Sequence, residues 1–120
     1  MTGLIRGDQS VGRHSYLGEF ELLVMLSVLH AGDEAYGVTI RQEIEERVGR
    51  PVSRGALYLT LERLVEKGYL RARMADATRV RGGRARKYYR VQRAGLAAIR
   101  DARATIAQMA RGLESVLGKV

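Results

Sequence analysis

The clearest indication of the fold lies in residues 53–90, which read SRGALYLTLERLVEKGYLRARMADATRVRGGRARKYYR. It opens on Ser53, whose hydroxyl can cap a helix, and leucines at helical spacing then predict an amphipathic helix that ends at Gly68. Two β-prone segments follow, at 69–74 and 86–91, with an arginine- and glycine-rich loop between them. A helix followed by a cation-rich hairpin is the layout of a winged helix. Such a fold offers a helix to the major groove of DNA and a wing to the neighbouring backbone.

Positive charge dominates the composition. The 120 residues include 21 Lys and Arg against 13 Asp and Glu, which gives a formal net charge of +8. Residues 71–93 carry Arg or Lys at nine positions against one acid, Asp76. Charge of this sign favours a polyanionic partner, either nucleic acid or an anionic surface. Its concentration in a hairpin predicts contacts with DNA phosphates or with the minor groove.

The length and the hydrophobic content of 46% predict one small globular domain with an added element. We expect a flexible N-terminal tail over 1–15, a winged helix-turn-helix domain over 16–92 and a C-terminal dimerisation helix over 93–120. Helices over about 17–30 and 35–48 should precede the helix that begins after Ser53. On the second of these helices, the charged residues should face outward, namely Arg41, Glu43, Glu45, Glu46 and Arg47. The expected fold class is therefore mainly α with a two-stranded β-wing.

Two of the expected helices carry more apolar surface than one small subunit can cover. The helix at 17–30 is apolar on most sides, and the last helix, expected as one continuous rod over 94–117, has an apolar seam at heptad spacing. We therefore predict a homodimer that is held together by these two helices. The expected interface residues are Leu17, Phe20, Leu23, Leu96, Ile99, Ile106, Met109, Leu113 and Leu117.

The sequence gives little support to catalysis, metal binding or a membrane location. The absence of cysteine excludes disulfides and thiolate metal sites. His14 and His30 are isolated, and no phosphate-binding glycine loop or nucleophile elbow is present, so we expect no enzyme, no cofactor and no metal site. The most apolar run, at 22–29, is too short to span a bilayer, and the N-terminus lacks a signal-peptide core. We therefore expect a cytoplasmic protein.

Candidate DNA contacts come from the outer face of the helix that follows Ser53 and from the hairpin. An anion is favoured at a helix N-terminus, and Gly55 would allow a backbone phosphate to approach closely there. Tyr58 either donates a hydrogen bond to DNA or covers the hairpin, and each arginine either neutralises a phosphate or contacts guanine. The residues that we predict to contact DNA are Tyr36, Ser53, Arg54, Gly55, Tyr58, Leu59, Arg63, Arg79, Arg81, Arg84, Arg86 and Lys87.

Several short segments carry a resemblance to a known family. They are LGEFELL at 17–23, YGVTI at 36–40, SRGALY at 53–58, LERL at 61–64 with GYL at 68–70, and GRARKYY at 83–89. With these segments in this order, the chain resembles the PadR family of bacterial transcriptional regulators, in its short subfamily with a single C-terminal helix. The resemblance implies a homodimeric winged-helix repressor on an inverted-repeat operator. It also implies release by a small molecule or another signal, and packing of the C-terminal helix on the first helix of the partner.

The chain departs from the family pattern in two respects. The family usually has proline after the Leu-Tyr pair, where this chain has Leu59, which predicts a straighter helix or a methyl contact with thymine. Some short members hold planar drugs at the dimer centre with tryptophan, and this chain has no tryptophan. The sequence also leaves one alternative open, a winged-helix adaptor that contacts protein or RNA without binding an operator.

Overall fold

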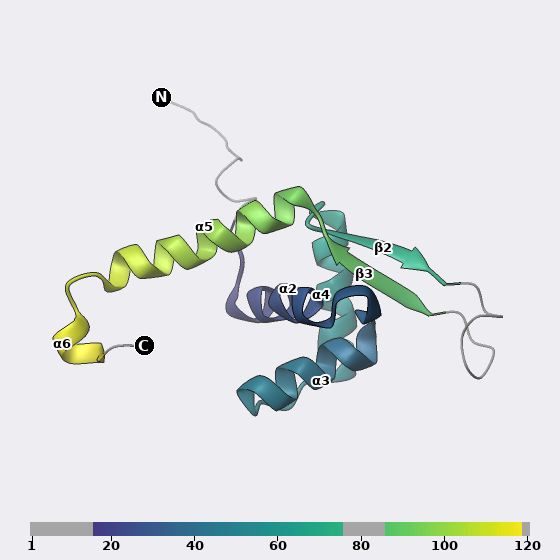
Figure 1. The fold of residues 1–120 in the computed structure, drawn as a ribbon, viewed down its shortest axis with the longest axis horizontal. Coiled ribbons are helices and arrows are strands. Elements are labelled where there is room, and N and C mark those ends of the chain that lie inside the picture. Colours follow the sequence, from purple (N-terminus) through teal and green to yellow (C-terminus); the bar gives the residue numbers. More distant parts are fainter. Residues whose placement is uncertain (1–15, 76–85, 119–120) are drawn as a thin grey trace, which may run out of the picture.

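The computed structural model describes residues 16–75 and 86–118 (Figure 1). Its elements are α2 (Glu19–Ala31), the 3₁₀ turn η1 (Gly32–Glu34), α3 (Gly37–Val48), α4 (Arg54–Glu66), β2 (Leu70–Met74), β3 (Lys87–Val91), α5 (Arg93–Ala110) and α6 (Glu114–Leu117). The predicted fold class is confirmed, because the described chain is mainly helical and its strands form one two-stranded sheet. The predicted N-terminal tail and the tip of the hairpin, with Arg79, Arg81 and Arg84, lie outside the described residues.

The core forms where α2 meets α3, α4 and the sheet. Val24 and Met25 of α2 are completely buried, as are Ile40 of α3 and Leu61 and Leu64 of α4. Leu17, Phe20 and Leu23 are partly buried and pack against this same core. Much of the apolar surface of α2 is therefore covered within its own subunit, although the sequence suggested that a second subunit was needed there.

Helix α4 begins and ends where its sequence predicts. The Ser53 hydroxyl accepts a hydrogen bond from the Ala56 N–H at 3.1 Å, which satisfies one of the free donors of the first turn. The predicted inner face is buried. The chain leaves the helix through Gly68, whose φ of 82° lies in the left-handed region that glycine adopts without strain.

The sheet is antiparallel, and its register alternates core residues with solvent-facing residues. Ala72 pairs with Tyr89 on the core face, whereas Arg71 pairs with Arg90 on the outer face. We call β2, β3 and the residues between them the wing. The Tyr89 N–H donates to the carbonyl of Ala35 at 2.9 Å, and an isolated bridge joins Tyr36 to Tyr88. The wing is thus tied to the segment that leads into α3.

Helix α5 starts in close contact with the core and then leaves it. A Cβ added at Gly95 would lie 2.8 Å from Cε of Met25 and 3.0 Å from Cγ1 of Val91, so glycine permits this close approach. Ile99 is buried in its own subunit. Figure 1 shows the remainder of α5 extending away from the other helices.

The prediction of one continuous C-terminal helix over 94–117 is wrong. Helix α5 ends at Ala110, and the short helix α6 follows after a turn in which Gly112 has a φ of 90°. Backbone in this left-handed region cannot continue a right-handed helix. Leu113 and Leu117 consequently do not extend the seam of α5 along one straight axis.

Candidate nucleic-acid interface

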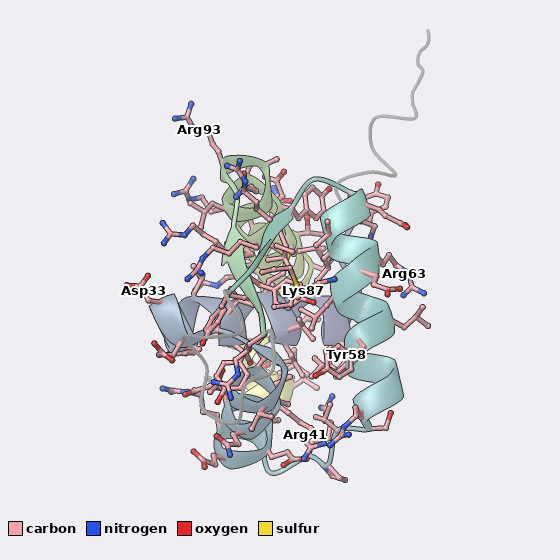
Figure 2. The ribbon with its side chains drawn as sticks, turned by 90° about the vertical axis from the view of Figure 1, so that its right-hand side faces the viewer. Asp33, Arg41, Tyr58, Arg63, Lys87 and Arg93 are labelled. Atoms are coloured by element: carbon pink, nitrogen blue, oxygen red, sulfur yellow. The ribbon has the colours of Figure 1, made fainter. Side chains whose placement is uncertain are left out.

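The outer face of α4 is largely exposed to solvent. Arg54, Gly55 and Arg63 are exposed, and Leu59 is 57% exposed although it is apolar. Figure 2 shows Tyr58 and Arg63 on this helix, with Arg63 projecting from its outer side. An apolar side chain that is more than half exposed contributes little to the core, so Leu59 remains available to a partner.

Tyr58 joins α4 to the start of α3. A Cβ added at Gly37 would lie 2.8 Å from Cζ of Tyr58 and closer still to its hydroxyl oxygen, so the phenol occupies the space beside Gly37. The ring is nevertheless 42% exposed. Tyr58 therefore has one edge held by α3 and another edge open to solvent.

Two neighbouring residues at the N-terminal end of α4 differ in what they already do. The Ser53 hydroxyl is engaged in capping. By contrast, nothing lies within 4 Å of a Cβ added at Gly55. The fold itself therefore does not require glycine at this position, and the space in front of the first turn is open.

Arg41 belongs to this surface, although the sequence placed it on the outward, solvated face of α3. It follows Gly37 by one helical turn, which puts both on the side of α3 that meets Tyr58. Its Nε is buried without a hydrogen-bond partner among the described residues. Figure 2 shows Arg41 near the N-terminal end of α4. Only the four-residue spacing from Gly37 could have indicated this position from the sequence.

Lys87 lies on the same side as α4, whereas Arg86 does not. Successive residues of a strand point to opposite faces, and Lys87 shares its face with the buried Tyr89. In Figure 2, Lys87 lies between the wing and α4. Lys87 can therefore meet a partner that also contacts the outer face of α4.

Arg86 is engaged with aromatic rings of its own subunit. Its guanidinium carbon lies 4.0 Å from the centroid of the Tyr36 ring, and that ring meets Tyr88 edge-on at 5.5 Å. A hydrogen bond with Tyr88 raises the pKa of Arg86 above its ordinary value, so the group stays charged. Tyr36 and Arg86 were both predicted to contact DNA. Each of them thus already has a partner within the subunit, on the outer face of the wing.

Clusters of metal ligands and membrane-spanning helices are both absent from the described residues. No group of three or more His, Asp or Glu side chains in the described ranges could hold a metal ion. Burial is the main cause of the raised pKa of Tyr89, and Tyr58 and Glu62 raise it further, so this phenol stays protonated near neutral pH. None of the described helices is both long and apolar enough to cross a membrane.

Comparison with known proteins identifies the family. Residues 25–101 match the transcriptional regulator PadR-like family. The transcriptional regulator Rv3488 of Mycobacterium tuberculosis is 41% identical over 90 residues, which cover 73% of this chain and 79% of that protein.

Solved structures agree with this match. A PadR family transcriptional regulator from Eggerthella lenta has a TM-score of 0.63 and 28% identity, over 85% of this chain and 88% of that one. A PadR family regulator from Clostridium difficile has a TM-score of 0.66 over 82% of this chain and 99% of that one, and its 22% identity supports the fold alone. The chain therefore belongs to the PadR-like family, whose members are DNA-binding transcriptional regulators and not enzymes.

Proposed function

We propose that the protein is a homodimeric repressor that binds an inverted-repeat operator in double-stranded DNA and is released by a small molecule or another signal. In this proposal, the outer face of α4 enters the major groove and supplies the sequence preference. The wing lies on the adjacent backbone, where Arg79, Arg81, Arg84 and Lys87 add affinity. The segment at 16–92 would bind DNA and the segment at 93–120 would hold the dimer together.

One observation carries the DNA-binding part of the proposal. The exposed face of α4 presents arginine and leucine side chains and the open edge of Tyr58 to solvent, and cations from two other elements flank it. Arginine and tyrosine hydrogen-bond to phosphates and base edges, and an apolar side chain can contact the methyl group of thymine. The flanking cations, Arg41 and Lys87, are suited to the phosphates on either side of a groove that holds α4.

The free surface of α5 supports the dimer. Ile106 is 68% exposed and Met109 is 76% exposed, on a helix whose first half is buried against the core. A groove of about 770 Å³ runs between the start of α2, at Leu17 and Leu22, and α5 at Ala102 and Ile106. Large apolar side chains beside a groove of this size are typical of an interface between subunits. A second copy of the chain would cover both features.

Selection of bound duplexes from a random pool tests the proposal. Two α4 helices in a dimer should select a near-palindrome whose half-sites lie one helical turn apart, about 34–36 Å, or a multiple of that distance. Anisotropy titrations would then compare the selected duplex with random duplex and with RNA of equal length. Equal affinity for all three nucleic acids would refute operator binding and support the adaptor alternative.

Replacing Arg41 with Gln should weaken binding to the selected duplex and to random duplex to the same degree. In this proposal the guanidinium meets a phosphate, and phosphate contacts carry no sequence information. The slope of log K against log salt should fall by roughly 1. Arg47, which pairs with Glu43 at 2.7 Å on the same helix, provides the control, since Arg47→Gln removes the same charge at a different place. A loss confined to the selected duplex would instead make Arg41 a base-reading residue.

A further inference from the structure

The outer face of the wing carries a second basic surface that the proposed DNA interface does not use. A cavity of about 380 Å³ opens there, between the sheet and η1. Arginines from both strands line it, namely Arg71, Arg73 and Arg90, together with Asp33 and Tyr88. A volume of this size lies within the range of small-molecule sites.

The cavity lies on the opposite side of the domain from the outer face of α4. Arg71 and Arg90 occupy the face of the sheet that points away from the buried Tyr89. Asp33, which lines the cavity and pairs with Arg90, lies across the molecule from Arg63 in Figure 2. A straight duplex seated on α4 would therefore leave the cavity open.

The register of the strands brings like charges together. Arg71 and Arg90 are direct cross-strand partners, and their Cβ atoms should be about 4.5–5.5 Å apart. Like charges at this spacing repel each other and destabilise the pair. A bound anion would remove that repulsion. The free energy of anion binding would therefore include this relief in addition to the contacts between the anion and the arginines.

The carboxylate at the site neutralises only part of this charge. Asp33 is the one acid among the described residues that line the cavity, and its oxygen lies 3.3 Å from a guanidinium nitrogen of Arg90. Both side chains are largely exposed, at 74% for Arg90 and 87% for Asp33, so the ion pair is weak. The three guanidinium groups and the one carboxylate leave a net formal charge of +2, which a bound anion would neutralise.

Arg73 is held in place by an aromatic ring. Its guanidinium carbon lies 4.8 Å from the centroid of the Tyr88 ring, which lines the same cavity. A guanidinium that stacks on a ring keeps its N–H groups in the plane available as donors. The Arg73 side chain is therefore already ordered, and it loses little further conformational entropy when it donates hydrogen bonds to a ligand.

We propose that this cavity binds a small organic phosphate monoester, whose dianionic phosphoryl group is held by Arg71, Arg73 and Arg90. A phosphate group offers three acceptor oxygens and close to two negative charges at neutral pH, which matches the charge and the planar donors of the site. The volume leaves room for a compact organic part beside the phosphoryl group. The proposal does not depend on operator binding, because the ligand would bind the protein in the absence of DNA.

Isothermal titration calorimetry on the full chain, with glycerol 3-phosphate as probe, tests the proposal. Sodium chloride keeps the ionic strength constant, and glycerol is the uncharged control. We expect one glycerol 3-phosphate per chain and no binding of glycerol. The double variant Arg71→Gln/Arg90→Gln should bind at least about tenfold more weakly, because it loses charge-assisted hydrogen bonds from both strands. The variant Arg47→Gln/Arg111→Gln loses the same charge outside the cavity and should bind like the wild type.

A third variant should change the affinity for glycerol 3-phosphate in the opposite direction. Asp33→Asn removes the competing carboxylate and should tighten binding about two- to fivefold, the contribution that is typical of an exposed ion pair. No binding to the wild type would overturn the proposal. Equal weakening in both double variants would do the same, because it would indicate a general effect of charge.

A DNA titration distinguishes the phosphate of a small molecule from the phosphate of the DNA backbone. Arg71→Gln/Arg90→Gln should bind duplex DNA with the same affinity and salt slope as the wild type. A reduced salt slope in this variant, with displacement of glycerol 3-phosphate by duplex, would assign these arginines to the DNA interface and overturn the proposal. Calorimetry needs no DNA, so a failure of operator binding would leave its result standing.

Discussion

Replacing Gly55 with Glu should abolish DNA binding and leave the fold intact. Nothing lies within 4 Å of a Cβ added at this exposed position, so the backbone can carry a side chain here without a clash at its first carbon. A carboxylate in the first turn interacts favourably with the positive end of the helix dipole. Replacing glycine also removes its helix-propensity penalty of about 1 kcal/mol, so α4 itself should become more stable. Against a phosphate backbone, the same charge costs several kcal/mol, which is a loss of more than about a hundredfold in affinity. Anisotropy with the selected duplex and thermal unfolding measure the two effects separately.

Two further variants at this position separate charge from bulk. Gly55→Gln has nearly the same shape as Gly55→Glu without the charge, and Gly55→Ala adds only a methyl group. If close approach of the backbone is what matters, Gly55→Gln should also bind poorly and Gly55→Ala should bind somewhat more weakly than the wild type. Wild-type affinity in Gly55→Glu, with a raised melting temperature, would show that the N-terminus of α4 does not face DNA.

Replacing both Ile106 and Met109 with Glu should convert the proposed dimer into monomers. These side chains are among the most exposed apolar groups of α5, and two carboxylates in a dry interface would each have to be desolvated without a partner. Their exposure in the single subunit means that the monomer should keep its helix content. Sedimentation velocity at several protein concentrations measures the change, and operator affinity should fall with it, because only one half-site remains engaged.

The matched control adds the same charge elsewhere on α5. Ala97 and Ala107 are both exposed, and at about 100° per residue they lie away from the stripe of Ile106 and Met109. Ala97→Glu/Ala107→Glu should therefore remain dimeric. A dimer that persists in Ile106→Glu/Met109→Glu would place the interface away from α5.

Local signals in the sequence predicted most of the elements. Ser53 at the start of α4 and Gly68 after its end give clear boundary signals, and both boundaries are confirmed within two residues. The two strands are confirmed within one residue of their predicted positions, because their residues combine β propensity with alternation. In each case, the decisive interaction lies within a few residues of the element that it defines.

The C-terminal helix shows where such local signals fail. Leucines continue at helical spacing past Gly112, at Leu113 and Leu117, so the periodicity predicted one rod, although the backbone turns there with positive φ. A single glycine inside a helix costs only about 1 kcal/mol, which the pattern could have tolerated. The sequence alone does not distinguish a tolerated glycine from one that ends a helix.

The site was predicted less completely than the fold, because its geometry depends on contacts between distant segments. The outer face of α4 follows from helical periodicity and needs no tertiary information. Arg86, by contrast, was predicted as a phosphate contact, and its stacking on Tyr36 joins residues fifty positions apart. Arg41 was assigned to solvent for the same reason, since its position beside α4 depends on how α3 and α4 cross.

The contact between Gly37 and Tyr58 has a consequence for how this sequence can vary. The phenol occupies the volume that a side chain at position 37 would fill, so Gly37→Ala alone should push the Tyr58 ring aside, toward its solvent-exposed edge. Gly37→Ala together with Tyr58→Ala leaves room for the new methyl group. A smaller residue at position 58, by contrast, leaves Gly37 undisturbed. Sequence drift at position 37 therefore moves a side chain on the outer face of α4, whereas drift at position 58 does not require a change at position 37.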